Sequence, residues 1–144
     1  MASIHKGKRF EREAATLLTK STGSQWQRVP QSGATATTKQ LEQKSWFGDV
    51  FTEDTKYQDV IVECKHYNKL ELSELFNTKS KLSGWIAKLE LQAGQSTDWV
   101  LLVKADRKGT YALANYASTL SRLGLMGILQ CFISTPRMTM IRIK

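Results

Sequence analysis

A carboxylate and an ammonium interrupt an otherwise apolar segment, VIVECKHY, at residues 60–67. Because side chains alternate between the two faces of a β-strand, Glu63 and Lys65 would share one face and the apolar residues beside them the other. The apolar neighbours predict a strand buried on both faces, where charged groups are rarely kept without a partner or a chemical role. The alternative is that the two charges form a solvated pair on an edge strand.

Asp49 is the carboxylate best spaced to join Glu63 in a metal site. If the turn-like residues 52–58 join two antiparallel strands, Asp49 falls opposite Glu63 or one residue out of register. Opposed side chains lie about 5 Å apart at Cβ, close enough for both to hold one metal ion. Asp59 shares the strand and the face of Glu63, but four residues separate the two by about 13 Å.

Clustered carboxylates beside a lysine are suited to phosphate chemistry. Magnesium prefers carboxylate, water and phosphate oxygens, so Asp49 and Glu63 could hold this ion at a phosphodiester. Lys65 would stand one pleat further along, about 6 to 7 Å from Glu63 at the backbone, and could orient the attacking water or stabilise the transition state. The pattern therefore predicts metal-assisted phosphodiester hydrolysis.

The elements that must position these residues follow from hydrophobic periodicity and turn residues. Gly84 is a possible weak point in a long second helix, and the polar residues 31–45 predict a long loop of a kind that is often functional. The order of elements predicts an α/β or α+β sandwich around a central mixed sheet. Helices are expected at residues 4–19, 70–93 and 115–123, and strands at residues 25–29, 46–51, 57–67, 98–105, 110–114, 128–133 and 138–143.

Composition limits the class of protein. The chain has 144 residues, enough for one compact domain over residues 1–144 but too few to expect two. It is 41% hydrophobic and 24% charged, which is typical of a globular domain rather than a disordered chain. No apolar run is long enough to span a bilayer and no signal segment begins the chain, so a soluble cytoplasmic protein without a membrane partner is expected. Cys64 and Cys131 lack metal-site spacing and are expected to be reduced thiols.

The charge balance indicates a polyanionic partner. Lysine and arginine number 21 against 13 acidic residues, a formal net charge of +8, and nucleic acid is the commonest partner of such a chain. A solvated helix face is the alternative for the basic cluster near the N-terminus. The residues expected to contact DNA phosphates are Lys6, Lys8, Arg9, Arg12, Arg28, Lys39 and Lys44.

Four segments occur in an order and at spacings that suggest a known family. They are KGKRFEREAATLL (6–18), QRVPQSG (27–33), GDV (48–50) and VIVECKHY (60–67). Together they resemble the archaeal-type Holliday junction resolvases of the PD-(D/E)XK nuclease superfamily. The resemblance covers about residues 6–67, and the remainder only as a helix followed by strands. It implies an α/β fold with a restriction-endonuclease-like central mixed β-sheet flanked by helices.

The resemblance also implies roles for individual residues. It makes Glu11 a helical carboxylate near the metal, with Glu13 or a plain surface role for Glu11 as the alternatives. Gly48 stands where a proline often precedes the metal-binding aspartate, which predicts a looser start to that strand. Carried over residue by residue, the catalytic set is Glu11, Ser32, Asp49, Glu63 and Lys65, the metal ligands among them are Glu11, Asp49 and Glu63, and Arg28 matches an arginine just before the serine loop.

The family implies dependence on Mg²⁺ or Mn²⁺, a symmetric homodimer, and paired nicks across a four-way DNA junction. Two other functions stay open at this stage: a nuclease of the same fold that cleaves duplex or mismatched DNA, and a non-catalytic DNA-binding protein. His5 and His66 are expected to be surface or packing residues. Trp85 is expected in a core-facing stripe of the second helix, whose width leaves room for a dimer contact.

Overall fold

The computed structural model describes residues 2–30, 43–126, 129–134 and 138–143 of the chain. In chain order the elements are α1 (Ala2–Thr22), β1 (Trp26–Arg28), the 3₁₀ turn η1 (Lys44–Phe47), β2 (Val50–Thr52), the 3₁₀ turn η2 (Thr55–Tyr57), β3 (Val60–Tyr67), the 3₁₀ turn η3 (Leu72–Phe76), α3 (Lys81–Ala93), β4 (Asp98–Ala105), β5 (Gly109–Ala114), α4 (Ala117–Arg122), β6 (Leu129–Ser134) and β7 (Thr139–Ile143).

The strands that the structure describes form one seven-stranded sheet in the order β1-β2-β3-β4-β5-β7-β6. β3 and β4 run parallel, whereas every other described neighbouring pair is antiparallel. A parallel pair needs a crossover connection, which η3 and α3 supply here. The sheet is therefore mixed and flanked by helices, and the predicted α/β, restriction-endonuclease-like fold is confirmed.

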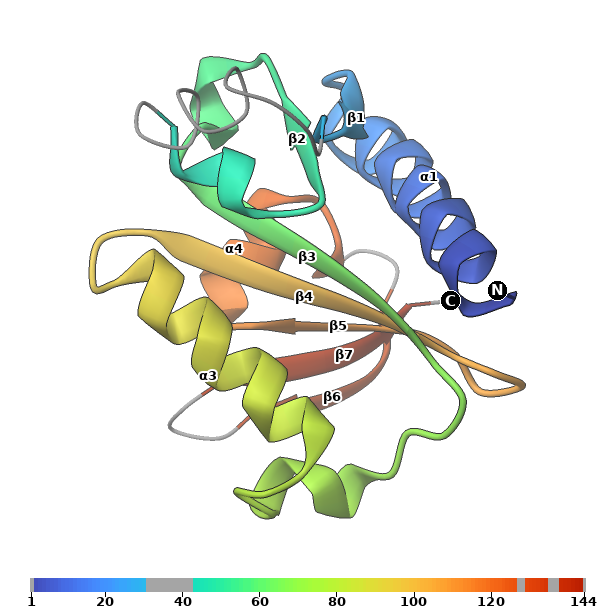
Figure 1. Cartoon of the computed structure of the whole chain (residues 1–144). Helices are drawn as coiled ribbons and strands as arrows, with labels where there is room; N and C mark the ends of the chain where they lie inside the picture. The colour runs from blue at the N-terminus through green and yellow to red at the C-terminus, as the bar shows by residue number, and fades with distance from the viewer. Residues whose placement is uncertain (1, 31–42, 127–128, 135–137, 144) are drawn as a thin grey trace.

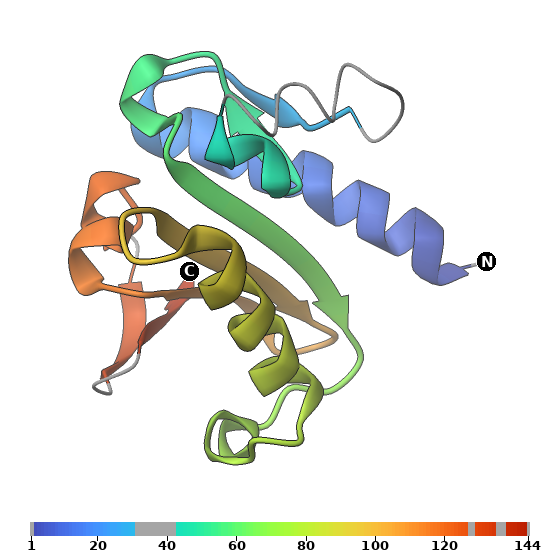
Figure 2. The same cartoon turned by 60° about the vertical axis from the view of Figure 1, so that its left-hand side comes forward.

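Helices cover both faces of the sheet (Figure 1). On one face Phe10 and Leu18 of α1 and Leu120 of α4 pack in a single apolar cluster with alternate residues of β3, β4 and β5. On the other face Leu82 and Ile86 of α3 pack with the residues between them. β3 thus runs between α1 and α3, as Figure 2 shows, and is buried on both faces as predicted.

Helix α1 forms because its apolar residues recur at one helical face. Phe10, Ala14 and Leu18 stand at i, i+4 and i+8, and all three are buried. The helix ends at Gly23, whose φ of 80° suits glycine and whose N–H donates to the carbonyl of Thr19 at 3.0 Å. The predicted first helix is confirmed and extends slightly beyond residues 4–19 at both ends.

The prediction of one helix over residues 70–93 is wrong. Residues 77–80 separate η3 from α3, and the break lies there rather than at Gly84. The cause is capping: the Ser80 hydroxyl accepts from the Ser83 N–H at 3.1 Å and donates to the Glu74 carbonyl at 2.7 Å, which starts a new helix at this point. As a result Phe76 ends η3 instead of continuing into α3, and it is 76% exposed.

The predicted strand at residues 46–51 is only half right. Its first residues form η1, where Trp46 packs its ring against Phe51 with centroids 4.6 Å apart, and β2 starts at Val50. The turn after β2 contains η2, and β2 and β3 form the antiparallel hairpin that the sequence predicted. No helix in the part of the chain that the structure describes is long and apolar enough to cross a membrane.

Candidate active site

The β2–β3 hairpin brings Asp49 and Glu63 together. Val50 pairs with Val62 in the antiparallel register, which places Asp49 opposite Glu63 as predicted. The Asp49 N–H donates to the Val62 carbonyl at 2.7 Å, and its carboxylate accepts from the Cys64 N–H at 2.8 Å. The Asp49 carboxylate therefore accepts a backbone hydrogen bond from β3 at the point where the β2–β3 ladder ends. This bond holds one of its oxygens in place.

Gly48 lets the two strands approach closely at this point. A Cβ at residue 48 would lie 2.4 Å from the Val62 carbonyl oxygen and 2.8 Å from the Val62 nitrogen, closer than real Cβ atoms come. Any side chain, a proline ring included, would push Asp49 away from β3. The expectation of a looser strand start is wrong, because Gly48 makes the contact tighter.

Asp49 and Glu63 are partly desolvated, and their negative charges repel each other. Burial raises the pKa of Asp49 first, and the Cys64 hydrogen bond opposes that rise, while the nearby charge of Glu11 adds to it. Burial and then the charge of Asp49 raise the pKa of Glu63 to about 7, against the opposing charges of Lys65 and Lys88. Two carboxylates side by side in a buried place favour a proton or a cation between them.

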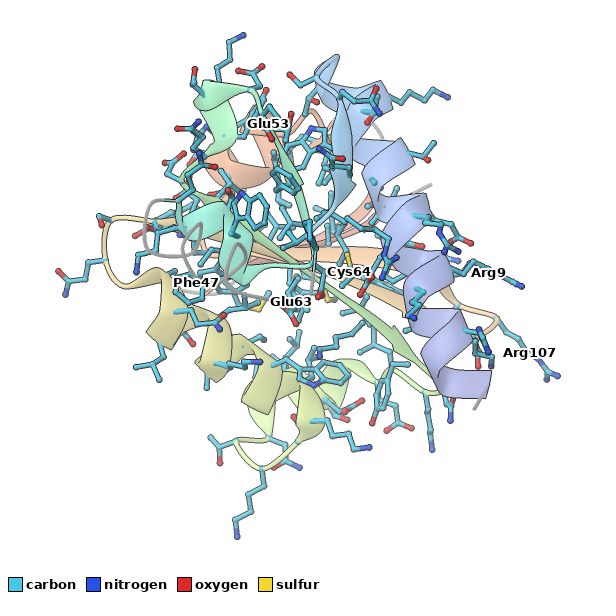
Figure 3. The ribbon with its side chains drawn as sticks, turned by 45° about the horizontal axis from the view of Figure 1, so that its top comes forward. Arg9, Phe47, Glu53, Glu63, Cys64 and Arg107 are labelled. Atoms are coloured by element: carbon cyan, nitrogen blue, oxygen red, sulfur yellow. The ribbon has the colours of Figure 1, made fainter. Side chains whose placement is uncertain are left out.

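Lys65 forms an ion pair with Glu63 in the described structure. Its Nζ lies 3.5 Å from Glu63 Oε1, and its side chain is 33% exposed. Since Glu63 and Lys65 share a face of β3 with the buried Ile61, they point toward the side that α3 covers. Figure 3 shows Glu63 in the middle of the molecule, with α1 on one side and α3 on the other.

Helix α3 contributes residues to the site that the sequence did not assign to it. The Lys65 Nζ lies 5.6 Å from the centre of the Trp85 ring, and Lys88 is close enough for its charge to lower the pKa of Glu63. Trp85 packs against the core as expected but is only half-buried. A tryptophan three residues before a lysine, beside the apolar stripe of α3, is the one sequence signal that could have pointed here.

Glu11 does not join the carboxylate pair directly. Its Oε2 accepts from Arg28 Nε at 2.7 Å, so α1 and β1 are linked by an ion pair with little exposure. In residues 2–30, 43–126, 129–134 and 138–143 no group of three His, Cys, Asp or Glu side chains could hold a metal ion. Glu11 acts on Asp49 through its charge, and a ligand role for it stays a prediction.

Asp49 and Glu63 fit a hard divalent cation. Carboxylate oxygens are the donors that Mg²⁺ and Mn²⁺ prefer, and Mg²⁺ usually takes one or two carboxylates and completes its shell with water and substrate phosphate. The fit rests on the structure itself: burial raises the pKa of both carboxyls, the charge of Asp49 raises that of Glu63 further, and a cation between them would offset both effects.

One comparison with known proteins identifies the family. The model of a family described as "phage putative PDDEXK endonuclease" matches residues 2–132. The chain belongs to this family. It is therefore a nuclease of the PD-(D/E)XK superfamily, as the sequence predicted, although the match does not extend to the archaeal-type junction resolvases. No curated protein and no solved structure matches the chain.

The basic residues expected to meet DNA in this PDDEXK endonuclease divide into two groups. Lys8, Arg9 and Arg12 are exposed on α1, and Figure 3 shows Arg9 pointing outward. The other described ones are engaged within the chain: Lys6 pairs with Asp106 at 3.6 Å, Arg28 with Glu11, and Lys44 donates to the Gln92 carbonyl at 3.1 Å. Ser32 and Lys39 lie outside the described residues.

Two neighbouring predictions concern Glu13 and His66. Glu13, the alternative to Glu11, points to a different partner, because its Oε2 lies 2.8 Å from Lys104 Nζ. His66 packs against the Phe10 ring and contacts Asp106 at 2.8 Å, on the face of β3 opposite Glu63. The packing role expected for His66 is confirmed.

Proposed function

We propose that the protein is a metal-dependent DNA endonuclease whose cleavage centre is formed by Asp49, Glu63 and Lys65. One observation carries the proposal: two partly buried carboxylates stand opposite each other at the end of a strand ladder, and a lysine lies 3.5 Å from one of them. A carboxylate pair with a raised pKa is costly to the fold, so it indicates a functional site rather than a structural one.

Each residue has a definite part in the proposed reaction. Asp49 and Glu63 would hold a divalent ion, whose chemistry would be to neutralise charge at the scissile phosphate and to lower the pKa of water. The Cys64 N–H fixes the orientation of Asp49, so the ligand oxygen does not have to be ordered when DNA binds. Lys65 has an ammonium on a flexible stem, and it hydrogen-bonds a phosphate oxygen or the attacking water as negative charge develops. The ligand role of Glu11 and the phosphate role of Ser32 remain part of the proposal.

DNA is the proposed substrate because of the family and the charge. The chain has a net charge of +8, and Lys8, Arg9 and Arg12 are exposed on the helix that flanks the site. A four-way junction is the proposed DNA structure, supported by the order of the four segments between residues 6 and 67. Symmetric cleavage of a junction needs two centres, so a homodimer belongs to this proposal.

The test compares end-labelled four-way junction with a linear duplex of the same arm sequence, with Mg²⁺, with Mn²⁺ and with chelator. Wild type, Glu63→Gln and the matched control Glu53→Gln are assayed together, since Glu53 is an exposed glutamate far from Glu63 in Figure 3. Binding is measured separately by gel shift, because loss of cleavage must be distinguished from loss of DNA affinity.

Paired nicks in the junction, lost only in Glu63→Gln while binding survives, are the expected result. Equal cleavage of junction and duplex would keep the metal-dependent centre and overturn the junction preference. Tight binding without cleavage in either metal would overturn the enzymatic proposal and leave a DNA-binding protein on a nuclease fold.

A further inference from the structure

Lys65 lies between a carboxylate and an aromatic ring. Its Nζ is 3.5 Å from Glu63 Oε1 and 5.6 Å from the centre of the Trp85 ring. We propose that Trp85 is a positioning residue, which holds the Lys65 ammonium at the cleavage centre in an orientation that leaves its N–H donors free for phosphate. This inference rests on the proposed function, because it assigns a role to Trp85 in that same site.

The physical need comes from the lysine side chain. Lysine is a point charge on a flexible stem, so a catalytic lysine must be restrained if it is to meet one phosphate oxygen. Glu63 alone is a poor restraint, because it consumes a donor and is itself a proposed metal ligand. An indole face attracts the ammonium through its quadrupole and takes no hydrogen bond, so the donors remain available.

Trp85 is itself held in place by its neighbours. Its ring meets Tyr67 edge to face, with centroids 5.3 Å apart and an interplanar angle of 82°. Tyr67 follows Lys65 by two residues on β3 and therefore shares its face. The buried Leu82 and Ile86 anchor α3 against the sheet beside this contact. The indole is thus fixed by both the helix and the strand that bear on the site.

Lysine acylation measures how accessible the Lys65 ammonium is, and it does not depend on nuclease activity. The protein is treated with a small succinimidyl ester, and peptide mass spectrometry follows Lys65 with the exposed Lys20 and Lys56 as internal references. In Trp85→Leu we expect Lys65 to react roughly two- to fivefold faster, the change in population that loss of an exposed cation–π contact allows. Trp85→Phe retains an aromatic face and should stay near the wild-type rate.

Cleavage kinetics give the second readout. In Trp85→Leu the single-turnover rate with saturating enzyme should fall about tenfold while the Kd for DNA stays unchanged, because a displaced catalytic group costs rate rather than binding. Trp85→Phe should recover most of that loss. The matched control is Tyr111→Leu, since Tyr111 packs half-buried against the same apolar cluster but lies over no cation in the described structure. The Tyr111→Leu variant should lose as much stability as Trp85→Leu and keep the wild-type cleavage rate.

The outcomes separate the two proposals. An inactive wild type would refute the proposed function, and the acylation result would still decide whether Trp85 restrains Lys65. Unchanged Lys65 reactivity in Trp85→Leu would overturn the inference, whatever happens to cleavage. Weakened DNA binding with unchanged reactivity would also overturn it, by making Trp85 a DNA contact. Equal rate losses in Trp85→Leu and Tyr111→Leu would reduce Trp85 to a structural residue.

Discussion

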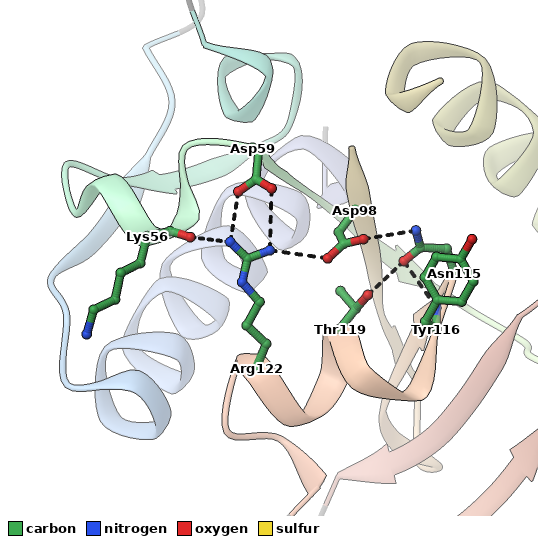
Figure 4. Close-up of polar contacts among 7 residues, drawn as sticks. All are labelled: Lys56, Asp59, Asp98, Asn115, Tyr116, Thr119 and Arg122. Atoms are coloured by element: carbon green, nitrogen blue, oxygen red, sulfur yellow. Dashed lines mark hydrogen bonds and ion pairs between the residues drawn. The ribbon is translucent and has the colours of Figure 1, made fainter. Parts of the chain in front are cut away.

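Two pairs of carboxylates lie on or directly beside strands β2, β3 and β4, and in the described part of the chain only one of these pairs is bridged by an arginine. At the start of β3 and β4, Asp59 and Asp98 are bridged by Arg122 of α4, at 2.9 Å and 3.2 Å, and the same guanidinium donates to the Lys56 carbonyl (Figure 4). Further along β3, Asp49 and Glu63 face each other with no guanidinium between them, and in the described structure Lys65 approaches only Glu63 within ion-pair distance.

The difference separates a pair that an arginine neutralises from the pair that we propose as a metal site. Hydrogen bonding to Asp59 raises the pKa of Arg122, which means that the folded state favours its charged form, and Asn115 donates to Asp98 at 3.3 Å as well. The first pair is therefore satisfied within the chain. The second pair carries the cost of burial and repulsion, which Lys65, Lys88 and the Cys64 N–H offset only in part, since the pKa of Glu63 stays raised.

The largest expected difference between the pairs is in cleavage. Asp49→Asn should lower the cleavage rate roughly a hundred- to a thousandfold, since it weakens a proposed metal ligand at the reacting phosphate. Asp98→Asn makes the same chemical change at the satisfied pair and should stay near the wild-type rate. Quenched-flow assays on labelled DNA measure both. A comparable loss in the two variants would remove the distinction between the pairs.

The next effect is on stability as a function of pH without divalent metal. The Glu63 pKa of about 7 in the folded protein is above the ordinary value of 4.5, so the folded state holds this proton more tightly than the unfolded chain does. The contribution of Glu63 is fully present below pH 4.5 and is lost as pH rises through 7. We expect the free energy of unfolding to lose about 3 kcal/mol over this range because of Glu63.

Urea unfolding in chelator at a series of pH values checks this expectation. Glu63→Gln should flatten the fall relative to wild type, whereas Glu53→Gln should reproduce the wild-type curve. Divalent metal should reduce the fall in wild type and in Glu53→Gln but not in Glu63→Gln. An identical dependence of the unfolding free energy on pH in wild type and Glu63→Gln would contradict the raised pKa of Glu63.

Gly48→Ala should disturb the Asp49–Glu63 pair and leave the Asp59–Asp98 pair unchanged. The added methyl would overlap the Val62 backbone, and the backbone shift that relieves such an overlap costs about 1–3 kcal/mol. Asp49 moves with residue 48, so cleavage should fall too, while the Arg122 contacts remain. Thermal unfolding and cleavage assays test this. Wild-type stability and rate in Gly48→Ala would show that the close approach is not needed.

The smallest effect is expected at the satisfied pair. Arg122→Gln removes contacts among partly exposed groups, so it should lower the free energy of unfolding by only about 0.5–1 kcal/mol. Cleavage should not change, because Arg122 binds the far ends of β3 and β4 rather than the site. Chemical unfolding measures the first and the junction assay the second. A large loss of cleavage with little loss of stability would assign the Arg122 cluster a part in function.

The sequence predicts those features that depend on neighbours along the chain. Alternation within VIVECKHY gives the shared face of Glu63 and Lys65, and the short hairpin gives the register of Asp49, because both depend on residues close in sequence. Features that depend on distant elements are missed. The Glu11–Arg28 ion pair and the approach of Trp85 to Lys65 depend on how α1 and α3 are placed over the sheet.

Two local errors have local causes. Apolar periodicity on both sides of residues 77–80 predicts one long second helix, but Ser80 caps a new helix at this point. Gly48 in place of a proline predicts a looser strand start, because the sequence does not show that the Val62 backbone lies against it. In both cases a hydrogen bond or a contact, rather than periodicity, decides the structure.

Calorimetric titration of the DNA-free protein with Mn²⁺ tests most directly whether the Asp49–Glu63 pair is a cation site. Wild type, Asp49→Asn and Asp59→Asn are compared at one pH and salt concentration. We predict binding in wild type and in Asp59→Asn, and its loss in Asp49→Asn. Equal binding in all three proteins, or none in wild type, would contradict the account.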